Sequence, residues 1–490
     1  MKEKNRFSNL LEHLMDVAEI KNYVMAKELQ YDVSYISKWT SGRMLPGAKT
    51  EKTVIQGISR CIVAHGTDEG LQTLLENYHV DSYEELEIAI FDNLIAEYQY
   101  VRDAERDTGS NIAHKTSYYP KLDMLHFISK MQHPVLRRIS SLEITAVMDL
   151  LAMEQEHRVQ ILNIQNSNHG ESWYYPNVHF SMVLNINRHH WDYIHDVFFL
   201  IHMISNTVHF HFDLYGSQQA IGRIMFAVKD EFSISGMLID GDQCLTVAVS
   251  EDPQNCETLH RYIKTLCTHD HLLVRPVSMR KMIGDNHYAR SLLSPKQQLL
   301  IGHFTEHFLS DALFEEILQQ IGNSLDDGIA AEELRKCHAM SKLSHSEFDI
   351  DLLFYRSTFS DFAVTGKLDF FNHQVTLSPK QRLQFITDLR NCLIRQRNIV
   401  PKVIIGQLIT DFPYEVGPSL LLSDTMAYLR LENYKKLHII NHGIMKCAFQ
   451  KCYEEIWNKD SSVVISDRDA VIQHIDHVLH QIRIIEKLEK

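Results

Sequence analysis

Hydrophobic periodicity changes once along this chain, and the change limits the folds open to it. From residue 7 to about residue 102, apolar residues recur three and four positions apart, as on one face of a helix. After about residue 118, short apolar runs alternate with helical patterns. The first pattern predicts an all-α domain and the second an α/β (α+β) body, so the fold is multidomain. The 490 residues provide for about three domains.

The composition is that of a soluble globular protein, with 44% apolar and 23% charged residues. The longest nearly uninterrupted apolar stretch, 197–204, is far shorter than the roughly 18–20 residues that span a bilayer. Glu3, Glu12 and His13 lie where a secretion signal would have an apolar block. Eight cysteines form no CxxC pair. We therefore expect a cytoplasmic protein with reduced cysteines and no membrane partner.

Charge is distributed unevenly along the chain. Residues 1–60 hold ten Lys/Arg and seven Asp/Glu, a net charge of +3. Because the whole chain carries −14, the other 430 residues carry a net charge of −17. A small basic N-terminal segment on a large acidic body indicates a local site for a polyanion.

The basic segment contains two short helical patterns separated by a break at Gln30 and Tyr31. Asn22 is the predicted cap of the first helix, and Asp32 is the predicted cap of the second. Gly42 stops the second helix. Leu29, Ile36 and Trp39 are expected to hold the two helices together, which leaves these outward-facing residues on the second helix: Val33, Ser34, Tyr35, Ser37 and Lys38.

The segment MAKELQYDVSYISKWTSGRMLP (25–46) resembles the core of the Cro/repressor-type (XRE) helix-turn-helix family. The resemblance covers residues 7 to about 65. Departures from the family pattern are Met25 for Leu, Gln30 where the turn usually has Gly, and Thr40–Ser41 for Glu-Asn. The matching residues are Ala26, Leu29, Ile36, Ser37, Trp39, Gly42, Arg43 and Pro46.

This resemblance implies that helix 33–40 enters the major groove of double-stranded DNA. Val33, Ser34, Ser37 and Lys38 would face base edges, and Tyr35 and Arg43 would lie nearer phosphates. It also implies a homodimer, because two half-sites multiply specificity. We expect a bacterial-type, sequence-specific transcriptional regulator whose body senses a signal or oligomerises. The alternative is an interaction, antitoxin-like or phage-associated protein that uses the N-terminal domain as a tether or autoregulator.

We predict four segments: a helix-turn-helix domain (1–66), a helical connector and linker (67–117), and two α/β domains (118–290 and 291–490). Ser82 and Glu85 form a capping box that starts a helix to about Arg102. That helix packs either on the N-terminal domain or against a second copy. The C-terminal helix, 469–490, is expected to pack back on the last domain, since it holds fewer than three heptads.

The body also contains a weak internal repeat, the sequence echo, in which similar apolar segments recur in the same order. It predicts two related tandem domains. A crevice between two such domains is where a small-molecule or peptide ligand would bind. Residues 217–235 have no counterpart in this alignment. Each pair is expected to be a strand or hairpin in the same order: 158–164 with 349–355, 179–186 with 373–377, 207–216 with 401–411, and 237–252 with 419–433.

No motif of a known catalytic type is present, so we predict neither an enzyme nor a cofactor. Histidine, with 29 residues, is in excess. A histidine cluster suits metal sensing or a pH response, but no carboxylate or thiolate stands at ligand spacing beside these histidines, and we predict no metal. The cluster consists of His189, His190, His195, His202, His209 and His211.

Overall fold

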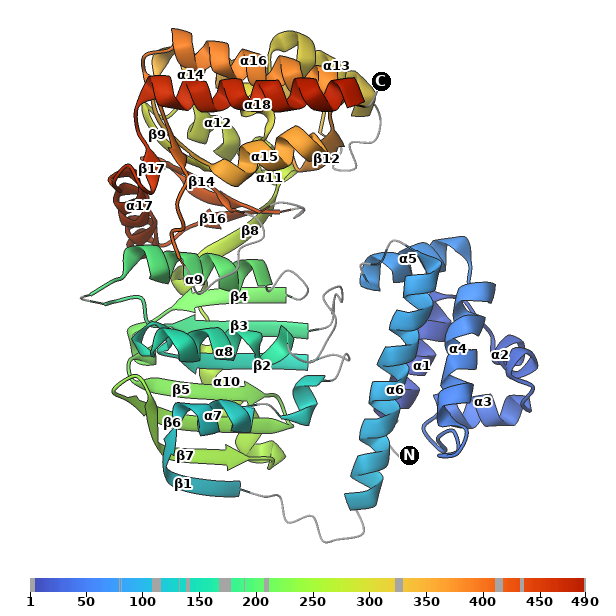
Figure 1. Cartoon of the computed structure of the whole chain (residues 1–490). Helices are drawn as coiled ribbons and strands as arrows, with labels where there is room; N and C mark the ends of the chain where they lie inside the picture. The colour runs from blue at the N-terminus through green and yellow to red at the C-terminus, as the bar shows by residue number, and fades with distance from the viewer. Residues whose placement is uncertain are drawn as a thin grey trace. The chain divides into compact units, whose positions relative to one another are not determined.

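The structure is a computed structural model, and it has an all-helical N-terminal region followed by a mixed α/β body with two large sheets (Figure 1). This confirms the coarse fold class predicted from the sequence. The chain divides into two compact units, Met1–Asn187 with Asn206–His271 and Arg188–Ser205 with Leu272–Lys490. The described residues are 5–78, 80, 82–107, 116–131, 133–137, 142–166, 178–188, 190–206, 211–321, 329–409, 417–431 and 436–488.

Residues 5–107, the helical head, share one apolar core. Leu74 of α5 and Leu94 of α6 belong to the same core as Leu11 and Ile58, and the Phe7 ring packs edge-on against Tyr98 at 5.9 Å. Of the two alternatives left open for the helix after Ser82, the structure has it packed on the head. The helices are α1 (Arg6–Val17), α2 (Asn22–Leu29), α3 (Val33–Thr40), α4 (Glu51–His65), α5 (Asp68–Tyr78) and α6 (Tyr83–Asp107).

The first unit also contains a seven-stranded sheet with the order β1-β7-β6-β5-β2-β3-β4. Strands β2, β3 and β4 are parallel, and the remaining pairs are antiparallel. Ile263 of α10 packs on Val147 and Val183. The strands are β1 (Thr116–Asp123), β2 (Leu142–Met148), β3 (Val178–Leu184), β4 (His211–Gly216), β5 (Arg223–Val228), β6 (Phe232–Ile239) and β7 (Gln243–Ser250), and the helices are α7 (Met124–Met131), α8 (Gln155–Asn166) and α10 (Pro253–Leu266).

The second unit contains an eight-stranded sheet with the order β17-β13-β10-β9-β14-β15-β16-β8. Strands β9, β10 and β13 are parallel, and the other pairs are antiparallel. A separate hairpin is formed by β11 (Lys367–Phe370) and β12 (His373–Thr376). The sheet strands are β8 (Val274–Ser278), β9 (Lys296–Ile301), β10 (Asp349–Tyr355), β13 (Ile399–Ile404), β14 (Ser419–Ser423), β15 (Ala427–Arg430), β16 (Lys436–Ile440) and β17 (Val464–Ile465).

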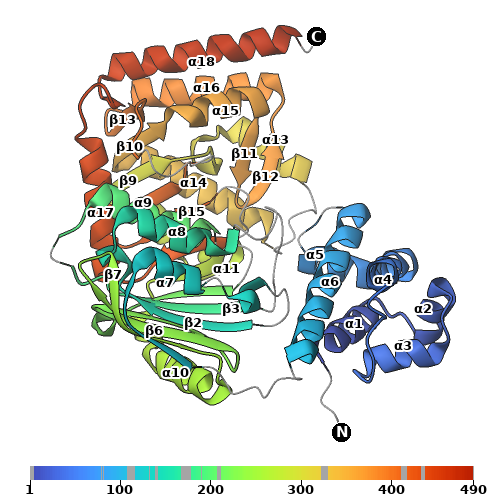
Figure 2. The same ribbon diagram turned by 60° about the horizontal axis from the view of Figure 1, so that its bottom comes forward.

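The helices of the second unit include α18, which packs on α15 and α16 and buries Val471, Ile475 and Ile482 (Figure 2). The C-terminal helix therefore packs back on the last domain, as predicted. The helices are α9 (Tyr193–Asn206), α11 (Met279–Gly284), α12 (His287–Leu292), α13 (Asp311–Ile321), α14 (Ala331–Glu347), α15 (Arg356–Thr365), α16 (Pro379–Arg395), α17 (Gly443–Trp457) and α18 (Arg468–Leu488).

The two sheets repeat one topology. In each sheet, three parallel strands lie beside an antiparallel meander of three strands. The last strand of the meander then pairs with the strand that precedes the parallel set in the sequence. Thus β1 to β7 correspond in order to β8, β9, β10, β13, β14, β15 and β16, with β17 as an addition. The duplicated order agrees with the sequence echo, although the echo paired several segments wrongly.

The pairing of 158–164 with 349–355 is wrong, because 158–164 lies in α8 and the counterpart of β10 is β3. Segment 373–377 is not the counterpart of 179–186 either, since it falls on the separate β11–β12 hairpin. Residues 217–235 are not an insertion, because they include β5, the counterpart of β14. The pairing of 237–252 with 419–433 is therefore shifted by one strand, since β7 corresponds to β16 and not to β15. The echo assumed a nearly constant offset, but the β9–β10 connection is much longer than the β2–β3 connection.

Candidate functional site

Helices α2 and α3 are joined by a short turn and pack on each other and on α1 and α4 (Figures 1 and 2). Gln30 ends α2 in the left-handed conformation (φ 56°, ψ 38°), the backbone position that glycine adopts most cheaply. Gln30 therefore adopts, at the end of α2, a conformation in which glycine would be free of strain.

Asp32 is the N-cap of α3, as predicted. The backbone N–H of Ser34 donates to its carboxylate at 2.9 Å, and hydrogen bonds from Ser34 lower the pKa of Asp32. The other predicted cap is wrong by one position, because Asn22 is the first residue of α2. Lys21 is the N-cap of α2, and its ammonium group has no acceptor for the free N–H groups of the first turn.

One side of α3 is buried and the other is exposed. Ile36 and Trp39 are 0% and 1% exposed, which places them in the core of the head. The exposed side consists of the five residues that the periodicity predicted to face outward: Val33, Ser34, Tyr35, Ser37 and Lys38. These side chains form one continuous face over two turns, because residues three and four apart are neighbours on a helix.

Arg43 is exposed immediately beyond the C-terminal end of α3. Gly42 takes a φ of +73°, which turns the chain so that the Arg43 N–H donates to the Lys38 carbonyl at 3.0 Å. The Tyr98 hydroxyl of α6 donates to the Pro46 carbonyl at 2.9 Å and holds the segment that follows. The backbone at Arg43 is therefore fixed against the C-terminal end of α3.

The cations of this face are available to an external anion. In the described part of the chain neither Lys38 nor Arg43 forms an ion pair, whereas Arg60 of α4 pairs with Glu87 of α6 at 3.0 Å. Other exposed cations of the same region are Lys21, Lys27, Lys49 and Lys52. The arrangement suits a polyanion that lies along α3.

The described members of the histidine cluster belong to different elements. His195 and His202 lie in α9, while His211 of β4 stacks on His179 of β3, with ring centroids 4.7 Å apart. His189 and His209 lie outside the described residues. Over the residues that can be described, no group of three or more His, Cys, Asp or Glu side chains is arranged to hold a metal ion.

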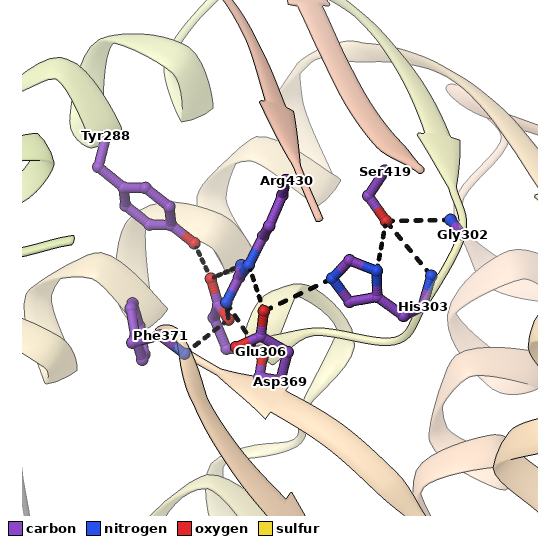
Figure 3. A network of polar contacts seen from close by, with 8 residues as sticks. All are labelled: Tyr288, Gly302, His303, Glu306, Asp369, Phe371, Ser419 and Arg430. Atoms are coloured by element: carbon purple, nitrogen blue, oxygen red, sulfur yellow. Dashed lines mark hydrogen bonds and ion pairs between the residues drawn. The ribbon is translucent and has the colours of Figure 1, made fainter. Parts of the chain in front are cut away.

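A second polar site, which the sequence did not indicate, lies at the carboxyl end of β9 (Figure 3). Arg430 at the end of β15 donates two hydrogen bonds to Glu306, at 2.9 and 3.1 Å. It also donates to the carboxylate of Asp369 in β11 at 2.7 Å and to the Asp369 carbonyl at 3.2 Å. The Tyr288 hydroxyl and the Phe371 N–H also donate to Glu306. Its members are spread over more than 140 residues, so no spacing in the sequence could reveal them.

This network, defined by Tyr288, His303, Glu306, Asp369, Ser419 and Arg430, also contains a hydroxyl–imidazole–carboxylate row. Ser419 Oγ lies 3.2 Å from His303 Nδ1, and His303 Nε2 lies 3.5 Å from Asp369 Oδ2. Ser419 Oγ also accepts hydrogen bonds from the Gly302 and His303 N–H groups, and Ser419 is only 7% exposed. The row is therefore directed inward, and its contacts hold the loop after β9 against β11, β14 and β15.

The comparisons with known proteins add little to this geometry. No model of a protein family and no curated protein matches the chain. Among solved structures, it is similar to TrmBL2, an archaeal chromatin protein described as showing a novel mode of DNA binding. The likeness has 12% sequence identity and a TM-score of 0.17, and it covers 42% of this chain and 59% of TrmBL2. A TM-score this low supports no argument about fold or function.

One further structural finding concerns membranes. Over the described residues, no helix combines the length and the apolar character that crossing a bilayer requires.

Replacement of Arg430 by Met is expected to destabilise the second unit by about 3–5 kcal/mol, because it leaves two buried carboxylates without their cation. The matched control is Arg335→Met, which removes an ion pair to Glu315 of similar geometry (2.8 Å) but is about half-exposed. The control should cost no more than about 1 kcal/mol. Urea unfolding of the two variants measures the difference, and equal losses would contradict the role of the network.

The same network predicts an acid transition. Burial raises the pKa of Asp369, but Arg430 and His303 outweigh burial and bring it down to about 2, from an ordinary value of 3.8. A carboxylate whose pKa is lowered on folding stabilises the fold above its unfolded pKa, so this contribution is present above pH about 4 and is lost as the pH falls toward 2. Thermal unfolding between pH 5 and 2 should show a smaller pH dependence for Asp369→Asn than for the natural chain.

The family resemblance implies DNA contacts on the exposed face of α3, and changes in this face test that implication by separating base contacts from phosphate contacts. Lys38→Ala is expected to lose about 1–3 kcal/mol of preference for the cognate sequence, while Arg43→Ala should weaken binding to all sequences alike. Fluorescence anisotropy with cognate and scrambled duplexes measures both. Lys451→Ala, which removes an exposed lysine of α17, is the control. If Lys38→Ala and Arg43→Ala both bind as the control does, the face is not the interface.

Proposed function

We propose that this protein is a sequence-specific DNA-binding transcriptional regulator that inserts α3 into the major groove of double-stranded DNA. The observation that carries the proposal is the two-sided character of α3. Its inner side is locked into the head by Ile36 and Trp39, and its outer side presents hydroxyl, aliphatic, aromatic and ammonium groups. The major groove is wide enough for a helix and displays acceptors and methyl groups that such side chains recognise.

The interface residues in this proposal have distinct roles. Lys38 donates to guanine O6 or N7, the acceptors that Lys and Arg most often contact, and Ser34 and Ser37 bond to base edges. Val33 contacts an apolar base edge such as a thymine methyl group. Arg43 and the exposed lysines of α2 and α4 neutralise phosphates. The supporting sequence evidence is the resemblance of residues 25–46 to Cro/repressor-type helix-turn-helix proteins.

The α/β body is proposed to sense a signal or to build a homodimer. A single α3 reads few base pairs, and a dimer that binds two half-sites about one helical turn apart gains both area and specificity. A small-molecule or peptide ligand of the body would then alter DNA binding through the spacing or the stability of the dimer.

The test is a selection of binding sites from random-sequence duplexes with the full-length chain, at low and at near-physiological salt. The expected result is a short, near-palindromic site that is recovered at both salt concentrations, with log Kd rising linearly with log salt, because binding releases the counterions condensed on the DNA phosphates. Sedimentation of the complex gives the number of chains on the site.

Two other outcomes would contradict the proposal. Binding that is lost at the higher salt and selects no common sequence would favour the alternative, in which the head tethers or autoregulates an interaction protein. Absence of binding at low salt would remove DNA as a partner of α3.

A further inference from the structure

We propose that Tyr35 is a positioning residue: it holds the Lys38 ammonium group over its ring, so that Lys38 is oriented for one base before the protein meets DNA. This inference rests on the proposed function, and it assigns to Tyr35 a role different from the phosphate contact that the family resemblance implies. It names the residue that determines how selectively Lys38 acts.

The geometry of the pair is that of a cation–π contact. The Lys38 Nζ lies 5.5 Å from the centroid of the Tyr35 ring, within the roughly 6 Å over which the ring quadrupole attracts an ammonium ion. The two residues are three positions apart on α3, so the contact lies along the exposed face of the helix. Tyr35 is 42% exposed, which keeps one side of the ring open to solvent and to Lys38.

The Tyr35 ring is itself held by two neighbouring aromatic rings. It packs edge-on against Tyr31 in the α2–α3 turn, with centroids 5.8 Å apart and an interplanar angle of 71°. It also lies 6.5 Å from the ring of Trp39, and Tyr31 and Trp39 contact each other at 5.2 Å. Because Trp39 is 1% exposed, this aromatic cluster links the exposed ring to the core of the head. The orientation of Tyr35 is therefore set by the fold.

A held lysine differs in function from a free one. Lysine has four rotatable bonds in its side chain, and fixing them on binding costs conformational entropy. A free lysine at this position would meet phosphates and bases alike as a mobile point charge. Restricting Lys38 over Tyr35 reduces both the entropy lost on binding and the number of acceptors within reach, so the effect falls on specificity more than on non-specific affinity.

The test compares Tyr35→Phe, which keeps the ring, with Tyr35→Leu, which removes it, in the full-length chain on the selected duplex and on scrambled DNA. Tyr35→Phe is expected to bind as the natural protein does. Tyr35→Leu should bind the selected duplex about two- to fivefold more weakly and leave binding to scrambled DNA unchanged. In a Lys38→Ala background, Tyr35→Leu should have no further effect.

A spectroscopic measurement on the free protein makes the test independent of DNA. In chain labelled with ¹³C at the lysine ε-carbon, the Lys38 resonance, assigned by its loss in Lys38→Ala, should show an upfield ring-current shift. The shift should persist in Tyr35→Phe and disappear in Tyr35→Leu. Tyr23→Leu, a change of an exposed tyrosine in α2, is the matched control for the removal of a surface ring. Thermal unfolding verifies that each variant is folded.

Three results would overturn the inference. Equal weakening by Tyr35→Phe and Tyr35→Leu would show that the hydroxyl contacts a phosphate. Additive losses from Tyr35→Leu and Lys38→Ala would show that the residues act separately. Absence of the upfield shift would show that the pair does not exist in solution. Failure of the proposed function is distinguishable, since the shift would then be present while no duplex is bound.

Discussion

Trp39 and Ile36 anchor α3 in the core of the helical head. This anchorage determines which side chains of α3 face outward and form the candidate interface. An indole and a branched alkyl group leave water only when α3 lies against α1 and α2, and each contributes about 1.5–3 kcal/mol or more when fully buried. Rotation of α3 about its axis would expose both. The same anchorage orients Tyr35 through the aromatic cluster and places Arg43 beyond the end of the helix.

The body follows a different principle. Two sheets of the same strand order build the two halves of the α/β region, but their polar interiors have diverged. After β2, Asp149 accepts hydrogen bonds from the Asn185 side chain and the Gly222 N–H, whereas after β9 a buried arginine is shared by two carboxylates. In both places a loop that leaves a parallel strand is fixed by polar contacts, because its backbone groups cannot be paired within the sheet.

Prediction from the sequence succeeded where the signals were local. The cap at Asp32, the stop at Gly42 and the outward face of α3 each depend on residues fewer than ten positions apart, and the structure has all three. Prediction failed where the signal was a short apolar run with no flanking residues that distinguish a strand from a helix. Residues 158–164 resemble a strand by composition but form α8, and β5 was taken for an insertion, because period alone does not distinguish a short buried strand from a buried helical segment.

The sequence by itself determined the order of an α-helical head and an α/β body, the boundaries of α3 and the residues on its exposed side. These follow from side-chain spacing and backbone preference, which act within one or two turns of the chain. Only the tertiary structure decided which strands pair, that Tyr98 of α6 donates to the Pro46 carbonyl, and that Arg430 joins Glu306 to Asp369. Those contacts unite residues from separate elements, and their free energy exists only after the chain has closed the loops between them.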